Sequence, residues 1–112
     1  MDALVSEYLY RRSTDGILLA DDTGMISELN PAAAALLGVP PESVIGKYPI
    51  QAFKTNPALL NLFNREGDQA LDVRLPRKRL AAGIASTLAD GRRIVLLHDV
   101  TEQRELESRR EA

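Results

Sequence analysis

The sequence contains no cysteine and no tryptophan, and its only histidine is His98. Without cysteine the chain can form no disulfide, no thiolate metal site and no cysteine nucleophile. One imidazole with no companion is poor evidence for a metal site. It also forms no catalytic triad, because no plausible serine or cysteine partner accompanies it. There is no glycine-rich phosphate loop either. These absences disfavour an enzyme, and no residue is assigned a catalytic or metal-binding role.

Long apolar segments are absent as well. Ile17–Ala20 and Ile94–Leu97 are among the longest runs, far below the roughly 20 residues that span a bilayer. The first twelve residues carry Asp2 and Glu7 and do not resemble a secretory signal. The 14 basic and 16 acidic residues are well mixed, so the chain offers no basic surface for nucleic acid or an anionic membrane. We expect one cytoplasmic domain with no nucleic-acid partner and no membrane insertion by this segment.

Apolar periodicity and turn residues predict the order helix, two strands, short helices, three strands, helix. Asn30-Pro31 and Asn56-Pro57 are strong helix starts, because asparagine accepts an otherwise unpaired N–H and proline suits the first helical position. This order is typical of an α+β fold in which helices are inserted into an antiparallel sheet. The expected units are an amphipathic helix at 1–14, a core at 15–102, and the start of a C-terminal helix or linker at 103–112. Within the core we expect strands at 16–21, 25–29, 70–75, 79–89 and 92–100, and helical segments at 32–37, 40–46 and 58–64.

Asp90-Gly91 is a dipeptide preferred in two-residue type I′ hairpins. Counting outward from such a turn pairs Gly83 with His98 on one face and Ile84 with Leu97 on the other.

Two of the expected strands are apolar at consecutive positions, Ile17–Ala20 and Ile94–Leu97, which indicates that both of their faces are covered. The inserted helices can cover one face. The N-terminal helix, a partner subunit, or both must then cover the other. The N-terminal helix has one apolar face, so we expect a homodimer through it. The residues of this expected dimer face are Leu4, Val5, Tyr8 and Leu9.

Five stretches, in this order, resemble the PAS family: residues 15–21, 24–30, 31–38, 43–47 and 99–102. The first two are similar to the family's opening hairpin, the third to its asparagine-led helix, the fourth to its "eliGk" segment, and the last to its aspartate–x–threonine ending. The resemblance implies a five-stranded antiparallel sheet with short helices inserted between strands 2 and 3, flanked by terminal helices. It also implies a small pocket beneath the helices and a role in sensing or dimerisation within a signalling protein.

Within that family, the thiol-linked chromophore and covalent flavin branches need a reactive cysteine, which is absent here. Haem-binding relatives carry a histidine on a central helix, whereas His98 lies on the last expected strand. Non-covalent flavin stays open, although aromatic residues make up only 4% of the chain. The stretch from Lys47 to Gly67 is short for the family, which disfavours a large cofactor. We therefore expect no cofactor, and an unidentified small ligand remains possible.

The candidate pocket residues come from the expected middle helix, the segment before it and the last hairpin. The simpler interpretation is that they only form the hydrophobic core. They are Phe53, Leu59, Leu62, Phe63, Ile84 and Leu97.

The exit from the core is the most informative segment. Asp99 and Glu102 have capping-box spacing, in which Asp99 accepts the N–H of Glu102 and Glu102 reaches back, and Thr101 offers a competing cap. The resemblance makes these three residues the candidates for signal transfer to an effector domain beyond residue 112. The main hypothesis is a PAS sensing and dimerisation domain of a larger cytosolic protein, a sensor histidine kinase. The alternatives are an interaction module without a ligand, or a small enzyme on a similar α+β scaffold.

Overall fold

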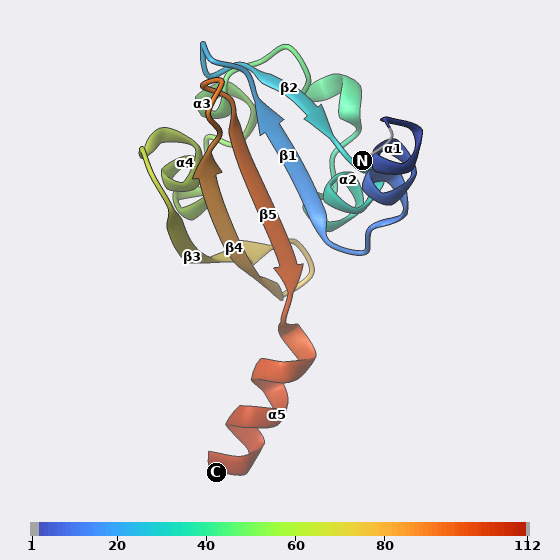
Figure 1. Cartoon of the computed structure of the whole chain (residues 1–112). Coiled ribbons are helices and arrows are strands. Elements are labelled where there is room, and N and C mark those ends of the chain that lie inside the picture. The colour runs from blue at the N-terminus through green and yellow to red at the C-terminus, as the bar shows by residue number, and fades with distance from the viewer. Residues whose placement is uncertain (1–2, 112) are drawn as a thin grey trace.

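The computed structural model describes residues 3–111, without the side chains of Ala3, Val5, Arg110 and Glu111. Five antiparallel strands form one sheet in the order β2-β1-β5-β4-β3 (Figure 1). The expected α+β fold is therefore confirmed. The elements are α1 (Ala3–Arg12), β1 (Gly16–Ala20), β2 (Ile26–Leu29), α2 (Pro31–Leu37), η1 (Pro41–Ser43), α3 (Pro49–Ala52), α4 (Pro57–Asn64), β3 (Gln69–Leu75), β4 (Arg79–Thr87), β5 (Arg93–Asp99) and α5 (Thr101–Glu111).

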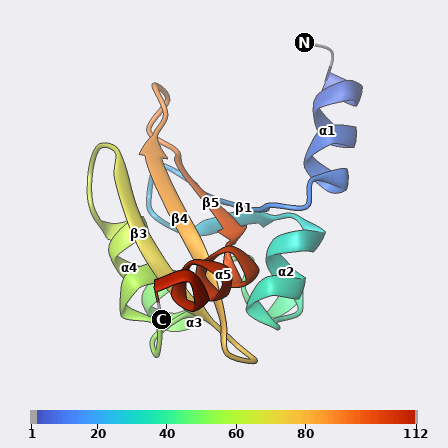
Figure 2. The same cartoon turned by 90° about the horizontal axis from the view of Figure 1, so that it is seen from below.

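The core lies between one face of the sheet, called the inner face here, and the inserted helices. Figure 2 shows α3 and α4 together on one side of the sheet, while α1 stands apart beside β1 and α2. Leu18 of β1 and Leu97 of β5 are fully buried, as is Leu59 of α4. No helix within residues 3–111 combines the length and hydropathy needed to cross a membrane.

Both asparagine-led helix starts are confirmed. The Asn30 side chain accepts the N–H of Ala33 at 2.9 Å, and the Asn56 side chain accepts that of Leu59 at 3.3 Å. Each cap satisfies a backbone donor that has no partner inside its helix. The short helix α3 was not expected from the apolar pattern, because four residues are too few to show a helical period.

The expected register of the β4–β5 hairpin is wrong by one residue. Leu88 donates its N–H to the Arg92 carbonyl at 2.7 Å, so three residues form the loop instead of two. Gly91 has a φ of 91° and Asp90 does not lie in the left-handed region, which is the pattern of a type I turn followed by a glycine bulge. Since neighbouring side chains point to opposite faces, the shift moves Ile84 to the outer face. Gly83 pairs with Leu97, and Ile84 with Leu96.

The outer face of the sheet is not covered by α1, contrary to the expected arrangements in which the N-terminal helix covers it (Figure 2). Helix α1 packs against α2 instead. Ile84 of β4 is 54% exposed, and its partner Leu96 is also exposed. Ile17, Leu19 and Ile94 are only half-buried. The outer face of this single chain is therefore an apolar surface open to solvent.

Candidate functional site

The exit junction, defined here as Arg79, Leu80, Asp99, Val100 and Thr101, joins α5 to the sheet. The Thr101 hydroxyl oxygen accepts the backbone N–H of Leu80 at 2.9 Å and donates to Asp99 at 2.6 Å. Val100 donates its N–H to the Leu80 carbonyl at 2.9 Å. Both backbone polar groups of Leu80 are thus taken by the two residues that lead into α5.

The expected capping box is wrong in detail. Helix α5 begins at Thr101, and Asp99 accepts the N–H of Thr101 at 2.9 Å, not that of Glu102. Glu102 is exposed in the first turn, where its negative charge favours the positive end of the helix dipole. Asp99 therefore makes an aspartate turn two residues long, and that turn positions Thr101 against β4.

Asp99 is held in its charged form. Burial alone would raise its pKa, but hydrogen bonds from Arg79 and from Thr101 outweigh burial and lower the pKa to about 2. Arg79 was not among the predicted site residues, although it forms an ion pair with Asp99. A correct hairpin register would have placed it diagonally across from Asp99, because Ala81 is the direct partner of Asp99.

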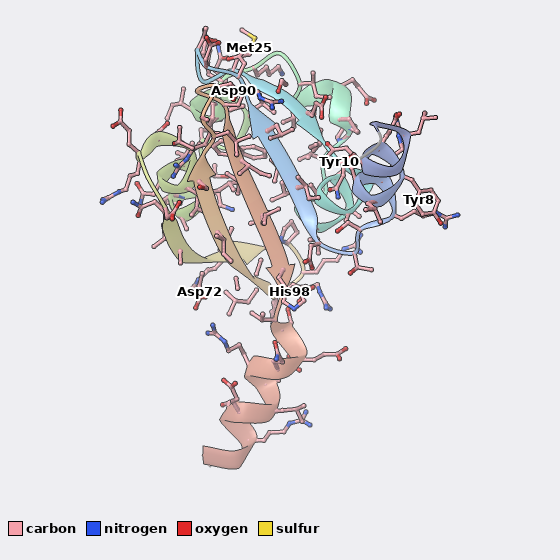
Figure 3. All side chains as sticks on the ribbon, in the orientation of Figure 1. Tyr8, Tyr10, Met25, Asp72, Asp90 and His98 are labelled. Atoms are coloured by element: carbon pink, nitrogen blue, oxygen red, sulfur yellow. The ribbon has the colours of Figure 1, made fainter. Side chains whose placement is uncertain are left out.

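A second contact holds α5 further along. Arg104 donates two hydrogen bonds to the Asp72 carboxylate of β3, at 3.0 and 3.2 Å. In Figure 3, Asp72 lies near the end of the sheet from which α5 departs. The sequence offers no short-range signal for this pair, since 32 positions separate its members. Helix α5 is therefore attached to both β4 and β3.

The inner face brings together five of the six candidate pocket residues. Leu59, Leu62 and Leu97 are fully buried, and the Phe53 and Phe63 rings stack with centroids 6.2 Å apart. Ile84 is the exception, because it lies on the outer face. Leu62 sits directly on Gly83, where an added Cβ would meet the Leu62 Cδ1 at 2.6 Å. These side chains pack against one another as a core.

Arg93 is a buried charge that sequence reasoning missed. The residue is 5% exposed and lies on the inner face of β5. Its guanidinium donates to the carbonyl oxygens of Leu62 and Gly67 and to the Thr87 hydroxyl, and burial lowers its pKa. A cation there suits the negative end of the α4 dipole. Arg93 therefore fixes the end of α4 over the sheet.

The expected dimer face of α1 points away from the rest of the chain. Tyr8 is 58% and Leu9 is 51% exposed, and Leu4 is also exposed. Figure 3 shows Tyr8 on the side of α1 away from the sheet, and the Arg12 guanidinium lies 5.4 Å from its ring centre. The side chain of Val5, the fourth residue of this face, lies outside the described residues.

Asn30 connects α1 to the domain. It is fully buried, and its amide group donates to the Tyr10 carbonyl at 3.0 Å and to the Asp15 carbonyl at 2.9 Å. Its side-chain oxygen also accepts the N–H of Ile17 at 2.9 Å, besides that of Ala33. One residue therefore joins the end of α1, the start of β1 and the start of α2.

His98 pairs with Asp15, the residue just before β1. Its Nδ1 lies 2.6 Å from an Asp15 carboxylate oxygen, and both side chains are about half exposed. His98 lies opposite Ala82, not Gly83 as expected. Among the described residues, no group of three histidine or acidic side chains is placed to hold a metal ion.

The sequence of this chain matches the model of one protein family. A family model of the PAS fold matches residues 4–110 of this chain. No curated protein sequence matches this chain.

Solved structures match at low sequence identity. A domain of a sensory box sensor histidine kinase/response regulator from Geobacter sulfurreducens is 16% identical with a TM-score of 0.59, over 87% of this chain and 93% of that one. An RNA-binding light-oxygen-voltage receptor is 21% identical with a TM-score of 0.71, over 96% of this chain and 36% of that one. The PAS domain of the RpfR quorum-sensing receptor from Cronobacter turicensis, solved with BDSF, is 17% identical with a TM-score of 0.54, over 80% of this chain and 97% of that one. At these identities the likeness shows a shared fold.

Proposed function

Because this chain belongs to the PAS family, we propose that it is the sensing and dimerisation domain of a larger cytosolic signalling protein, a sensor histidine kinase. In this proposal the domain is regulatory and carries no catalytic residue. A change at the sheet or its helices reaches an effector domain through α5. The observation that carries the proposal is the attachment of Thr101 to Leu80.

The geometry of the exit junction supports this route. Val100 and Thr101 bind the backbone carbonyl and N–H of Leu80 on β4. Asp99 binds Arg79, which lies on β4 next to Leu80. A displacement of the start of β4 therefore moves the first turn of α5 with it. Arg104 and Asp72 add a second point of attachment, through β3. Asp99 and Thr101 act as the transmitting residues, and Glu102 supports the helix start by its charge.

Two exposed apolar surfaces support association with a second copy of the chain. One is the α1 face with Leu4, Tyr8 and Leu9, and the other is the outer face of the sheet around Ile84 and Leu96. Burying such surfaces between two copies is favourable, at about 25 cal/mol per Å² of apolar area removed from water. Dimer geometry would then respond to movements of α1.

An interaction module without a ligand is the second candidate, and the filled inner face favours it. Leu59, Leu62 and Leu97 are fully buried there, so a molecule on the inner face would have to displace core side chains. Mass spectrometry and absorbance of the freshly purified protein compare the two candidates. A bound small molecule or cofactor would favour the sensing candidate.

The main test uses the full-length parent protein. Thr101→Val removes the hydroxyl that contacts Leu80 with little change in shape, whereas Thr101→Ser keeps it. We expect Thr101→Val to alter the regulation of output, and Thr101→Ser to leave it near the wild-type level. Regulation that is unchanged by Thr101→Val would contradict the route through the exit junction.

Association is tested separately by sedimentation. Tyr8→Glu and Leu9→Glu place charges on the exposed α1 face without touching the core, and should produce a monomer. Glu66→Gln, on the exposed loop before β3, is the control. A wild-type domain that stays monomeric at high concentration would refute dimerisation through α1.

A further inference from the structure

A groove of about 930 Å³ lies between α1 and the edge of the domain formed by β2 and α2. Leu29, Ala34 and Ile45 give one wall an apolar character, and α1 forms the other wall. The volume falls within the roughly 300–1,000 Å³ typical of small-molecule sites. The groove is separate from the filled space between the inner face and α4, and it contains none of the candidate pocket residues.

Tyr10, on the α1 wall, carries a polar group that has no partner among the described residues. The Tyr10 hydroxyl is buried, and it has no hydrogen-bond partner within the described structure. Burial raises the Tyr10 pKa to about 12, with a further contribution from the nearby negative charge of Glu28. Figure 3 shows Tyr10 on the side of α1 that faces the domain. A buried hydroxyl without a partner is costly, so a group that bonds to it is favoured.

The charges that line the groove select the kind of group. Glu7 and Arg11 also line it, and they pair with each other at 3.3 Å. Glu28 is the remaining charge, and no hydrogen bond or ion pair joins its carboxylate to another described residue. The groove therefore has an excess negative charge near an unpaired hydroxyl oxygen. A ligand carboxylate would be repelled there, whereas an ammonium group could donate to both oxygens.

We propose that this groove binds a small organic ammonium compound, whose apolar body lies against Leu29, Ala34 and Ile45 and whose N–H groups bond to Glu28 and the Tyr10 hydroxyl. One ligand group then bonds both to the exposed Glu28 carboxylate and to the Tyr10 hydroxyl, which has no partner among the described residues. The bound molecule also bridges α1 to β2. Binding at the groove does not depend on the proposed function. Only the effect of that binding on signalling, through a change in the placement of α1, rests on the proposed function.

The test is an NMR titration of the isotope-labelled domain with 2-phenylethylammonium, with 3-phenylpropanoate as the anionic counterpart of similar shape. We expect the ammonium probe to shift the amide signals of α1, β2 and residues 41–45 in a saturable way. Glu28→Gln should weaken binding about ten-fold, which corresponds to about 1.4 kcal/mol. Tyr10→Phe should weaken binding without loss of folding, since it removes only the unpaired hydroxyl. Glu66→Gln, a charge change outside the groove, should leave binding unchanged.

Three results would overturn the proposal. They are equal binding of the two probes, shifts that map to inner-face residues such as Leu62, and unchanged affinity in Glu28→Gln. These results concern the isolated domain, whereas the Thr101 variants are scored by the output of the parent protein. Binding can therefore fail while the route through the exit junction holds, and the reverse outcome is equally distinguishable.

Discussion

Leu80 and Thr101 are 21 positions apart in the chain, yet the backbone N–H of Leu80 donates to the Thr101 hydroxyl oxygen at 2.9 Å. Leu80 belongs to β4, which pairs with β3 on one side and β5 on the other. The start of the last helix is therefore fixed to an interior strand of the sheet as well as to the strand that precedes it in sequence. We therefore expect a displacement of β4 that leaves β5 in place to change the direction of α5.

Thr101→Val should destabilise the domain by about 1–2 kcal/mol, because it leaves the half-buried N–H of Leu80 without a partner. The same change should speed amide exchange in the first turn of α5. Urea unfolding measures the free energy, and Thr101→Ser is the control because it keeps the hydroxyl. A valine variant as stable as the serine variant would show that the bond to Leu80 does not stabilise the domain.

Stability should fall in acid because of Asp99. Its pKa is about 2 in the folded protein, against 3.8 for the free group. The charged form therefore stabilises the fold above about pH 4, and the stabilisation disappears as the pH falls through about 2. Since Arg79 is 45% exposed, solvent screening limits this contribution to about 1 kcal/mol.

Asp99→Asn should make the free energy of unfolding depend less on pH between about pH 4 and about pH 2. Urea unfolding between about pH 2 and about pH 5 measures it. Asp90→Asn is a useful comparison, because Asp90 also has a lowered pKa but lies in the hairpin loop, away from α5. An acid dependence in Asp99→Asn equal to that of the wild type would assign the effect to other carboxylates.

Asn30→Asp should destabilise the domain by about 3 kcal/mol or more. Aspartate keeps the oxygen that accepts from Ile17 and Ala33, but it loses the amide group that donates to Tyr10 and Asp15. A buried carboxylate would then face two carbonyl oxygens without a compensating donor. Thermal and urea unfolding measure the loss, and amide exchange should rise throughout α1.

Asn56→Asp is the matched control for that substitution. Asn56 also caps a helix and also donates through its amide group, to the Arg74 carbonyl at 3.1 Å, but this bond is exposed. Aspartate and asparagine are about equally good at a helix N-cap. The control should therefore change stability by less than about 1 kcal/mol, and equal losses at the two sites would contradict the role given to Asn30.

Local sequence signals predicted the helix starts well. An asparagine that precedes a proline satisfies a donor only a few residues away, so Asn30 and Asn56 required no knowledge of the tertiary structure. The other bonds of Asn30, to Tyr10 and Asp15, could not be predicted in this way. They depend on where α1 ends relative to β1, and no local pattern encodes that placement.

The β4–β5 hairpin shows how one turn residue changes the site. Gly91 suits both a two-residue type I′ turn and a three-residue loop with a glycine bulge. Asp90 accepts the N–H of Arg92 at 3.1 Å, a local bond that accompanies the longer loop. Side-chain size along β4 does not decide the face either, because Ala82 of the outer face is as small as Ala81, Gly83 and Ala85 of the inner face.

The long-range partners of the site were missed for a different reason. Arg79, Arg93 and Arg104 contact residues 20 or more positions away. An arginine in the sequence looks like a solvated surface residue, and only the topology shows which carbonyl or carboxylate it reaches. Asp99 and Thr101 were found because the family resemblance marked them, whereas Arg79 carried no such mark.

Gly83→Ala should destabilise the domain by about 1–3 kcal/mol through overpacking. The added methyl group would meet Leu62 at 2.6 Å, and the Leu71 carbonyl oxygen and the Val73 side chain at 3.0 Å each. Leu62→Ala alone should cost about 2–5 kcal/mol, because it leaves a cavity in the core. In the double variant the new methyl group partly fills that cavity, so the two losses should sum to more than the measured loss. Urea unfolding of the wild type, the two single variants and the double variant completes this double-mutant cycle. Strictly additive losses would show that Leu62 does not pack on Gly83.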